Sequence, residues 1–459
     1  MYKNNTIIVF TSPFEKYPVG GFIRSFKVLP YLFHILRKRG YDIIPYIPLS
    51  ILHTVLRLEL LSGKTLEESI EGIRRELDKL ARITGCDYYH LIGEVFLEFA
   101  SSRFHDMKGK DVFFELFKKI PKLGFDVISE FTRWENWLIE TYYSRILGGE
   151  RPSLLYSMNE TIDTVYPLME LSRRTKTVSA IMLQQTPYKL VRLTFSKKLF
   201  TLISDHNVNS YSWKIFRRAL GTGYVRKLLG VSPAVFLAPG LLDIIRRMNI
   251  RVEVPYPANA VDEKIFGYRR WGGRELEAVY FGRLTPEKGV YDLVHIWANV
   301  EKQLPDARLR IFGSFRDERV RDKFMRYIER YGLRNIVLMG NRSREEVWSY
   351  AARAKVLIYP SYIDAFPLTV LESLALGLIV VAYNIPAIKY VYSSLEPVNI
   401  TSTGDLLEMS KKVVEALKIP IEFIKELYGM PRIKQFLSDH SSWERVAYAE
   451  AMSIIDVVE

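Results

Sequence analysis

Two carboxylates in one short stretch have the residue type and spacing to bind a polar ligand. Asp364 lies in a turn after the apolar run 356–359, and Glu372 follows eight positions later in a segment with helical spacing. The backbone N–H groups of Leu368 and Thr369 stand at the expected start of that helix, where free N–H groups and the helix dipole attract an anion. The stretch therefore predicts a site for an anion whose attached hydroxyl groups are held by carboxylates.

The elements that position these carboxylates follow from the surrounding pattern. Residues 356–359 predict a buried strand, and Pro367 suits the first turn of a helix because its missing N–H costs nothing there. Gly377 predicts the end of that helix, and residues 378–382 predict the next buried strand. A strand, loop, helix and strand in this order are typical of a parallel α/β sheet.

A second unit of the same kind carries two cations, Arg283 and Lys288. Residues 278–281 predict a strand, and a loop rich in glycine and proline follows it. An arginine and a lysine five positions apart in such a loop can bind one polyanion, arginine through its fork of donors and lysine as a point charge. Either unit alone also fits an ordinary turn and a solvated helix, so it is their combination that indicates a site.

Together the two units resemble the family-4 retaining glycosyltransferases of GT-B fold, also called glycosyl transferases group 1. The resemblance lies in the Gly-Arg…Lys-Gly loop and in the segment with two carboxylates eight positions apart, and it covers about residues 252–395. Residues 254–262 resemble the family's interdomain linker, with Ala260 in place of a glycine. The chain departs from the pattern at Asp364, where the family usually has glutamate.

This resemblance implies an α/β protein of GT-B fold, with two Rossmann-like domains facing a cleft. The N-terminal acceptor-binding domain is expected at 1–255, with a helical insertion at about 52–150. The nucleotide-sugar-binding domain is expected at 256–425, and C-terminal helices at 426–459 are expected to cross back onto the first domain. Residues 6–47 support the first domain because a strand, a turn containing Gly20 and Gly21, a helix and a strand succeed one another, without the GxGxxG spacing of a dinucleotide site.

The implied activity is transfer of a sugar, with retention of its anomeric configuration, from a nucleoside-diphosphate sugar to a hydroxyl group. UDP- or GDP-linked donors are expected, and the acceptor would be a lipid-linked or surface glycan precursor. By resemblance, the catalytic residues are Arg283, Lys288 and Asp364, and the cations stabilise the leaving diphosphate without a metal ion or cofactor. The remaining donor-binding residues are Gly20, Gly21, Gly282, Phe366, Leu368, Thr369 and Glu372.

The acceptor side is less like the family. Many members have a histidine near the reacting sugar at the end of the strand predicted here at 178–183, but this chain has Gln184 and Gln185. A glutamine amide can bind a sugar hydroxyl but cannot take up a proton as histidine does. Gln184, Gln185 and the nearby His206 are therefore the acceptor-side candidates.

The composition of the chain bears on metal binding, cellular compartment and source. The chain has one cysteine, Cys86, no Cys/His cluster with metal-ligand spacing and no Asp-x-Asp pair. No run approaches the roughly 18 apolar residues of a membrane span, and the N-terminus has no secretory pattern, so we expect a cytoplasmic protein. The content of only 4 Gln favours a thermophilic source.

The net charge of +13 is concentrated in residues 188–230, where nine cations face one acid, Asp205, and alternate with aromatic and aliphatic residues. Such a stretch favours binding to an anionic membrane surface, which would place the protein at the inner face of the membrane. A solvated basic face is the alternative. Nucleic acid is not expected as a partner, because no nucleic-acid-binding module is visible.

Two other functions fit the same pattern. A sugar epimerase or phosphorylase of GT-B fold would share the architecture but would need no acceptor groove. A non-catalytic nucleotide-sugar-binding or scaffold protein would keep the donor site, and the departures at Gln184 and Asp364 leave room for it.

Overall fold

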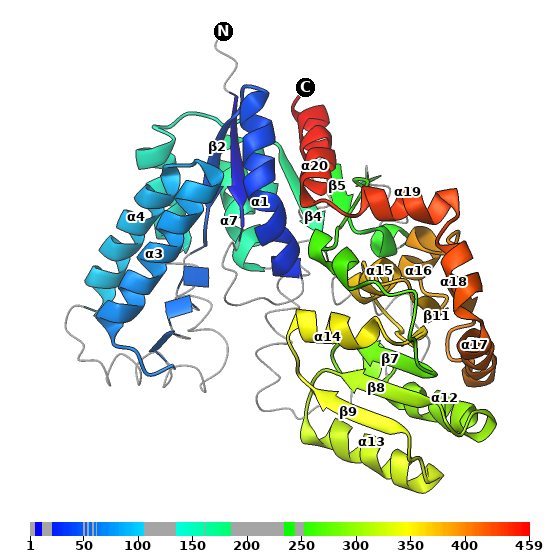
Figure 1. Cartoon of the computed structure of the whole chain (residues 1–459). Helices are drawn as coiled ribbons and strands as arrows, with labels where there is room; N and C mark the ends of the chain where they lie inside the picture. Colours follow the sequence, from blue (N-terminus) through cyan, green and yellow to red (C-terminus); the bar gives the residue numbers. More distant parts are fainter. Residues whose placement is uncertain are drawn as a thin grey trace.

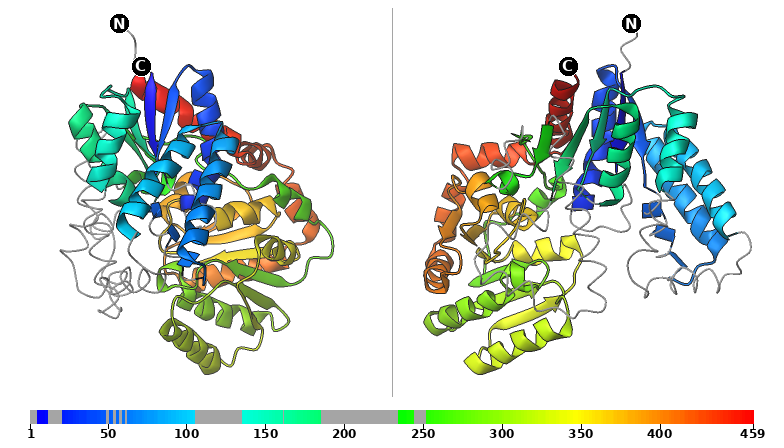
Figure 2. Two further views of the ribbon diagram at one scale, coloured as in Figure 1. Left: turned by 90° about the vertical axis from the view of Figure 1, so that its left-hand side faces the viewer. Right: turned by 180° about the vertical axis from the view of Figure 1, so that it is seen from behind.

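The chain forms two α/β domains, which Figure 1 shows from one side and Figure 2 from two others. The structure is a computed structural model of the whole chain. It describes residues 5–11, 21–48, 51–52, 55–56, 59–60, 62–104, 135–160, 162–184, 234–243 and 252–459.

The first domain is built on a six-stranded parallel sheet with the order β2-β1-β3-β4-β5-β6. The residues of β1, β3 and β4 alternate little in polarity because both faces of this sheet are covered, which is typical of parallel sheets. Helices α1 (Gly21–Lys38) and α7 (Ile162–Thr175) belong to this domain. The strands are β1 (Thr6–Phe10), β2 (Asp42–Tyr46), β3 (Leu154–Ser157), β4 (Ser179–Leu183), β5 (Ala234–Leu237) and β6 (Val252–Glu253).

The segment between β2 and β3 is helical where the structure describes it. Helices α3 (Leu66–Thr84) and α4 (Tyr88–Phe104) pack against each other, and a π-helical turn, η1, spans Tyr142–Ile146. Helix α3 starts with a capping box: the Thr65 side chain accepts from the Glu68 N–H, and the Glu68 carboxylate accepts from the Thr65 N–H. Thr65 and Glu68, three positions apart, are the sequence signature of such a box.

The second domain is built on another six-stranded parallel sheet, with the order β12-β11-β10-β7-β8-β9. Its chain order reverses between β7 and β10, which makes this position the topological switch point, where open α/β sheets bind ligands beyond the carboxyl ends of their strands. The predicted fold of two parallel-sheet Rossmann-like domains is thus confirmed. The strands are β7 (Glu277–Phe281), β8 (Arg308–Phe312), β9 (Ile336–Gly340), β10 (Val356–Tyr359), β11 (Ile379–Tyr383) and β12 (Val398–Thr401).

Helices cover both faces of this second sheet (Figure 1). Three of them bear on the site: α12 (Val290–Gln303) follows β7, α14 (Arg344–Ala351) precedes β10, and α15 (Leu368–Ala375) follows β10. The others are α13 (Glu318–Tyr331), α16 (Pro386–Val391) and α17 (Leu406–Lys418).

The C-terminal helices divide between the two domains. Helices α18 (Ile421–Leu427) and α19 (Pro431–Asp439) still pack on the second core, because Ile424, Ile433 and Phe436 are buried there. Only α20 (Trp443–Val458) joins the first core, where it lies along α1 (Figures 1 and 2). The crossing back to the first domain thus begins near residue 440, later than the expected 426.

A buried ion pair joins α20 to the first domain. The guanidinium of Arg24 on α1 lies 2.6 Å from the Glu450 carboxylate, and both side chains are almost fully buried. The Tyr156 hydroxyl donates to the same carboxylate at 2.6 Å. Breaking a buried pair leaves an uncompensated charge, so these contacts hold α20 to α1 and β3 specifically.

Candidate active site

Two loops at the switch point of the second sheet bring Lys288 and Asp364 together. Lys288 lies in the loop after β7, and its Nζ is 2.5 Å from Oδ2 of Asp364 in the loop after β10. The same Nζ also donates to the Ile363 carbonyl at 3.1 Å. Residues 76 positions apart in the sequence therefore form one charged unit at the carboxyl edge of the sheet.

Gly289 allows these two loops to approach so closely. It has φ +73°, and a Cβ at this position would lie 1.9 Å from the Pro360 carbonyl oxygen. Only glycine fits a left-handed conformation against another backbone at this distance without strain. A backbone hydrogen bond from the Tyr362 N–H to the Glu287 carbonyl, at 3.0 Å, closes the same contact.

Asp364 is held in its ionised form. The Tyr359 hydroxyl donates to Oδ2 at 2.6 Å, and the Phe366 N–H donates to Oδ1 at 3.2 Å. Burial alone would raise the pKa of Asp364, but the charge of Lys288 and these hydrogen bonds outweigh it, so the pKa is lowered. The carboxylate is therefore a fixed acceptor rather than a general acid.

Glu372 has a different environment. It is 8 % exposed on α15, and its Oε1 lies 3.2 Å from a guanidinium nitrogen of Arg344. Burial raises the pKa of Glu372 above its usual range, and the Arg344 charge opposes this only in part. Arg344 is the first residue of α14, and no local pattern in the sequence pairs it with Glu372.

Arg283 has a fixed backbone and an exposed side chain. The Tyr280 hydroxyl donates to the Arg283 carbonyl at 3.0 Å. The preceding Gly282 carbonyl lies so close to Gly313 that a Cβ at Gly313 would be 1.9 Å from it. Within the described part of the chain, the Arg283 guanidinium makes no hydrogen bond or ion pair, so its donors remain available to a ligand.

The N-terminus of α15 stands beside this basic loop. The helix begins at Leu368, one residue after the expected Pro367, which is the N-cap and provides no side-chain capping bond. The Thr369 hydroxyl donates to the Phe281 carbonyl at 3.3 Å and so ties the first turn of α15 to the end of β7. Phe366 is buried in the second core, where its ring packs edge-on against Tyr392.

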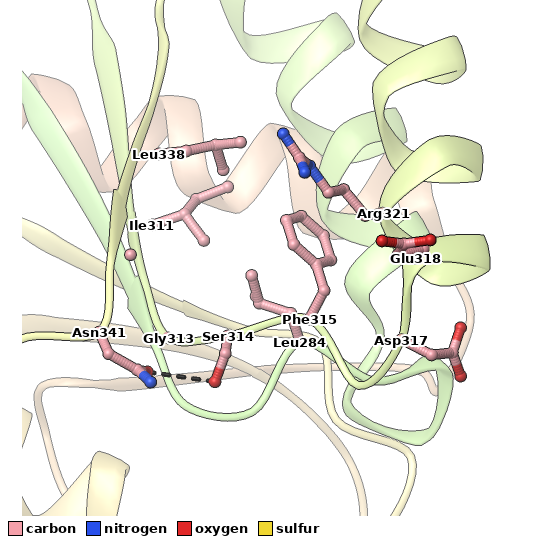
Figure 3. Close-up of a pocket in the computed structure, with 11 residues that line it drawn as sticks. Leu284, Ile311, Gly313, Ser314, Phe315, Asp317, Glu318, Arg321, Leu338 and Asn341 are labelled. Atoms are coloured by element: carbon pink, nitrogen blue, oxygen red, sulfur yellow. Dashed lines mark hydrogen bonds between the residues drawn. The ribbon is translucent and has the colours of Figure 1, made fainter.

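A pocket of about 400 Å³ adjoins the basic loop at the carboxyl ends of β8 and β9. Figure 3 shows the side chains of Leu284, Ile311 and Leu338 converging on it. The Ser314 hydroxyl donates to the Asn341 side chain at 3.2 Å. No sequence pattern predicts this pocket, because apolar residues at strand ends look like core residues in the sequence. Its lining is Leu284, Ile311, Gly313, Ser314, Phe315, Asp317, Glu318, Arg321, Leu338, Gly340 and Asn341.

Of the acceptor-side candidates, the structure describes only Gln184. Gln184 follows β4, and its amide donates to the Met158 carbonyl at 2.6 Å and to the Ser25 hydroxyl at 3.2 Å. Both amide N–H groups are therefore used within the first domain, and only the amide oxygen is left for a ligand. Gly21 is the first residue of α1. Gly20, Gln185, His206 and the basic segment 188–230 lie outside the described residues.

Among the described residues, no cluster of three or more His, Cys, Asp or Glu side chains has the arrangement to hold a metal ion. None of the helices in the described ranges has the length and apolar character needed to cross a membrane.

Known proteins resemble this chain in sequence and fold. Residues 262–427 match the family model described as Glycosyl transferases group 1. An uncharacterized glycosyltransferase from Haemophilus influenzae is 28% identical over 131 residues, which are 28% of this chain and 36% of that protein. The match thus spans about a third of the length of this relative.

Two solved structures share the fold over nearly the whole chain. Sucrose-phosphate synthase from Thermosynechococcus elongatus has a TM-score of 0.60 at 13% identity and covers 99% of each chain. The Anabaena HepE protein in complex with UDP and glucose has a TM-score of 0.56 at 11% identity and covers 98% of this chain and 99% of its own. Residues 262–427 therefore carry the sequence pattern of Glycosyl transferases group 1, in a chain with the two-domain GT-B fold.

Proposed function

We propose that this protein is a retaining glycosyltransferase that moves a sugar from a nucleoside-diphosphate sugar to a hydroxyl acceptor. The observation that carries the proposal is the Lys288–Asp364 unit at the switch point, beside the free start of α15. Cations, backbone N–H groups and carboxylates meet there, and a diphosphate with attached sugars needs all three.

The proposed reaction separates charge in a way that these groups support. The bond between the sugar's anomeric carbon and the diphosphate oxygen breaks, and the oxygen keeps the electron pair. Arg283 and Lys288 stabilise this developing negative charge, as do the N–H groups of Leu368 and Thr369. The acceptor hydroxyl bonds to the anomeric carbon on the same face, and its proton passes to the departing phosphate.

The carboxylates position the donor in this proposal. Asp364, which is ionised and fixed, accepts hydrogen bonds from hydroxyls of the transferred sugar. Glu372 accepts from the ribose hydroxyls, and the charge of Arg344 offsets part of the rise that burial causes in the pKa of Glu372. Phe366 sets the backbone next to the sugar through its N–H bond to Asp364.

The donor nucleotide, the acceptor and the absence of a metal requirement are part of the same proposal. We expect a UDP- or GDP-linked donor, and the UDP complex of the HepE protein makes UDP the first choice. The acceptor is proposed to be a lipid-linked or surface glycan precursor, reached from the inner face of the membrane through the basic segment 188–230. The charge of Arg283 and Lys288 would do the work of a metal ion, so activity in EDTA is expected.

The decisive experiment is a thermal-shift screen with UDP-, GDP- and ADP-linked sugars, followed by turnover with each ligand that binds. A ligand that binds only the folded state raises Tm by mass action. Slow donor hydrolysis in EDTA, and a transferred sugar of unchanged anomeric configuration, would support the proposal. Binding without any hydrolysis would favour a scaffold protein. Phosphate-dependent release of a sugar phosphate would favour a phosphorylase, and conversion of the donor sugar into its epimer would favour an epimerase.

The proposed binding of segment 188–230 to the membrane surface is tested separately by co-sedimentation with vesicles. Binding to anionic vesicles that falls with added salt is expected, because the attraction is electrostatic. Equal binding to neutral and anionic vesicles would contradict it and leave the donor chemistry untouched.

A further inference from the structure

The loop that carries Asp364 contributes to both domain cores. Ala365 packs against the hydrophobic core of the first domain, whereas its neighbour Phe366 is buried in the core of the second. The contact is reciprocal, because Ala238 of the first domain packs against the second core. A loop shared in this way takes its position from both domains.

Gly240 makes the contact from the first domain. It lies in the 3-10 turn Pro239–Leu241 after β5, and its N–H donates to the Ala365 carbonyl at 2.9 Å. A Cβ at Gly240 would lie 2.6 Å from the carbonyl oxygens of both Ala365 and Asp364, and 2.8 Å from the Ala387 Cβ. Two of these three neighbours are backbone atoms, so a side chain at Gly240 would have to displace the loop.

A second contact beside Gly240 joins the same two segments. The Tyr390 hydroxyl on α16 donates to the Asp243 carboxylate, two residues beyond the 3-10 turn. Helix α16 also packs along that turn. The first domain therefore touches the second at the loop and at the adjacent helix.

The loop is also held by the chain that crosses between the domains. The Phe366 ring stacks on the His440 ring with centroids 6.1 Å apart, and the His440 carbonyl accepts from the Val261 N–H of the interdomain linker at 2.9 Å. His440 itself is 1 % exposed and stacks on Phe436. Phe366 is thus held by the crossover just as Ala365 is held by the first domain.

We propose that Gly240 is a positioning residue for the sugar-transfer site: through its contact with the backbone of Asp364 and Ala365, the first domain fixes where the Asp364 carboxylate stands. The inference rests on the proposed function, since Asp364 is taken to hold the donor sugar. Arg283 and Glu372, which would hold the diphosphate and the ribose, lie on the second domain and, within the described ranges, make no bond to this loop, whereas Lys288 bonds to Asp364 and would move with it. Displacing the loop should therefore impair transfer more than nucleotide binding.

The test compares Gly240→Ala with Gly267→Ala, a matched control at a glycine that has nothing within 4 Å of its built Cβ. We expect Gly240→Ala to lower kcat by about 10- to 100-fold, the effect of a misplaced reacting group. Its Kd for UDP, measured by calorimetry, should stay within about twofold, because the nucleotide contacts remain. Gly267→Ala should match the wild type in both measurements.

Tyr390→Phe keeps the inference testable if Gly240→Ala does not fold. It removes one hydroxyl between the same segments, so kcat should fall by about 2- to 10-fold, the scale of one hydrogen bond, with UDP affinity unchanged. If Gly240→Ala folds and keeps the wild-type kcat, the inference is overturned. If Gly240→Ala does not fold, a wild-type kcat in Tyr390→Phe overturns it instead. A parallel loss of kcat and UDP affinity would also overturn it, because the contact would then support the whole site rather than position Asp364.

The proposed function fails in a distinguishable way. In that case the wild-type protein itself would show no turnover and no Tm shift with any nucleotide sugar, and both proposals would fall together. A wild type that turns over donor, beside unaffected Gly240 and Tyr390 variants, would remove only the inference about Gly240.

Discussion

Lys288 and Asp364 form an ion pair between loops that leave two neighbouring parallel strands, with Nζ and Oδ2 2.5 Å apart. The pair is partly buried, with the two side chains 18% and 21% exposed. The pair joins the cation proposed to bind the diphosphate to the carboxylate proposed to bind the sugar. A substitution at either residue should therefore change the position and the charge environment of the other.

A double-mutant cycle with Lys288→Met and Asp364→Asn measures this coupling. Lys288→Met leaves a carboxylate without its cation, so we expect each single variant to lose about 1–3 kcal/mol of unfolding free energy. The double variant should lose less than the sum, with a coupling of about 0.5–3 kcal/mol. The exposed pair Lys411–Glu415, whose side chains are 79% and 60% exposed, is the control and should show less coupling. If the losses of unfolding free energy in the two single variants simply add in the double variant, Lys288 and Asp364 are not coupled and the ion pair does not contribute to stability.

Removing either cation should slow the chemistry more than it changes folding. Arg283→Ala or Lys288→Ala should lower kcat by about 10²–10³-fold, the scale for losing one preorganised group that stabilises developing charge. Steady-state kinetics with the donor found in the screen provide the measurement, and Lys411→Ala on the outer face of α17 is the control. Wild-type turnover in both variants would exclude the proposed role.

Glu372 should act on donor binding instead. Glu372→Ala removes a charged acceptor for the ribose hydroxyls, so Kd for UDP should rise by about tenfold or more, as expected for hydrogen bonds to a charged group. At saturating donor, kcat should stay close to the wild-type value. Titration calorimetry checks the affinity, with the exposed Glu415→Ala on α17 as control. An unchanged Kd would count against the ribose assignment.

Gly289 should be intolerant of a side chain for two separable reasons. Gly289→Ala meets a positive φ and a Cβ 1.9 Å from the Pro360 carbonyl oxygen, whereas Gly332→Ala meets only a positive φ with nothing within 4 Å. We expect Gly332→Ala to cost about 1–2 kcal/mol of stability and Gly289→Ala to cost clearly more. Chemical unfolding of both variants decides this, and equal losses would show that the contact between the loops is unimportant.

His440 should make stability depend on pH in the acidic range. Burial lowers the pKa of His440 to about 4, whereas the unfolded side chain titrates near 6.5. Between these values the unfolded state binds more protons, so stability falls as pH falls. Between pH 7 and pH 5 this amounts to about 2 kcal/mol.

The replacement His440→Phe isolates this contribution, because it keeps an aromatic ring between Phe366 and Phe436 but cannot be protonated. Tm measured from pH 7 to pH 5 should fall more in the wild type than in the variant. Parallel curves would mean that His440 is not the titrating group.

Much of this protein could be predicted from local patterns. The strands before Asp364 and Arg283 and the end of α15 near Gly377 were all correct to within a residue or two. Caps, turn glycines and apolar runs act over a few residues, so the sequence states them directly. The same patterns placed Arg283, Lys288, Asp364 and Glu372 on loops and helix starts at the carboxyl ends of strands.

Other features depend on residues far apart in the chain. The Arg344 partner of Glu372, the pocket beside Leu284 and the contact of Gly240 with Ala365 have no local signal. Helix α19 was expected among the helices that return to the first domain but packs on the second core, because an amphipathic helix can face either core. Only packing decides which core buries such a face.

The sequence by itself therefore determined the α/β class, the two charged loops and the residue types in them. The tertiary structure decided that Lys288 neutralises Asp364, that Glu372 is buried against Arg344, and that the Asp364 loop is shared between two cores. The reason is physical: strand and helix propensities act between neighbours in the chain. The charge and burial of a site depend instead on which strands lie side by side at the switch point of the sheet.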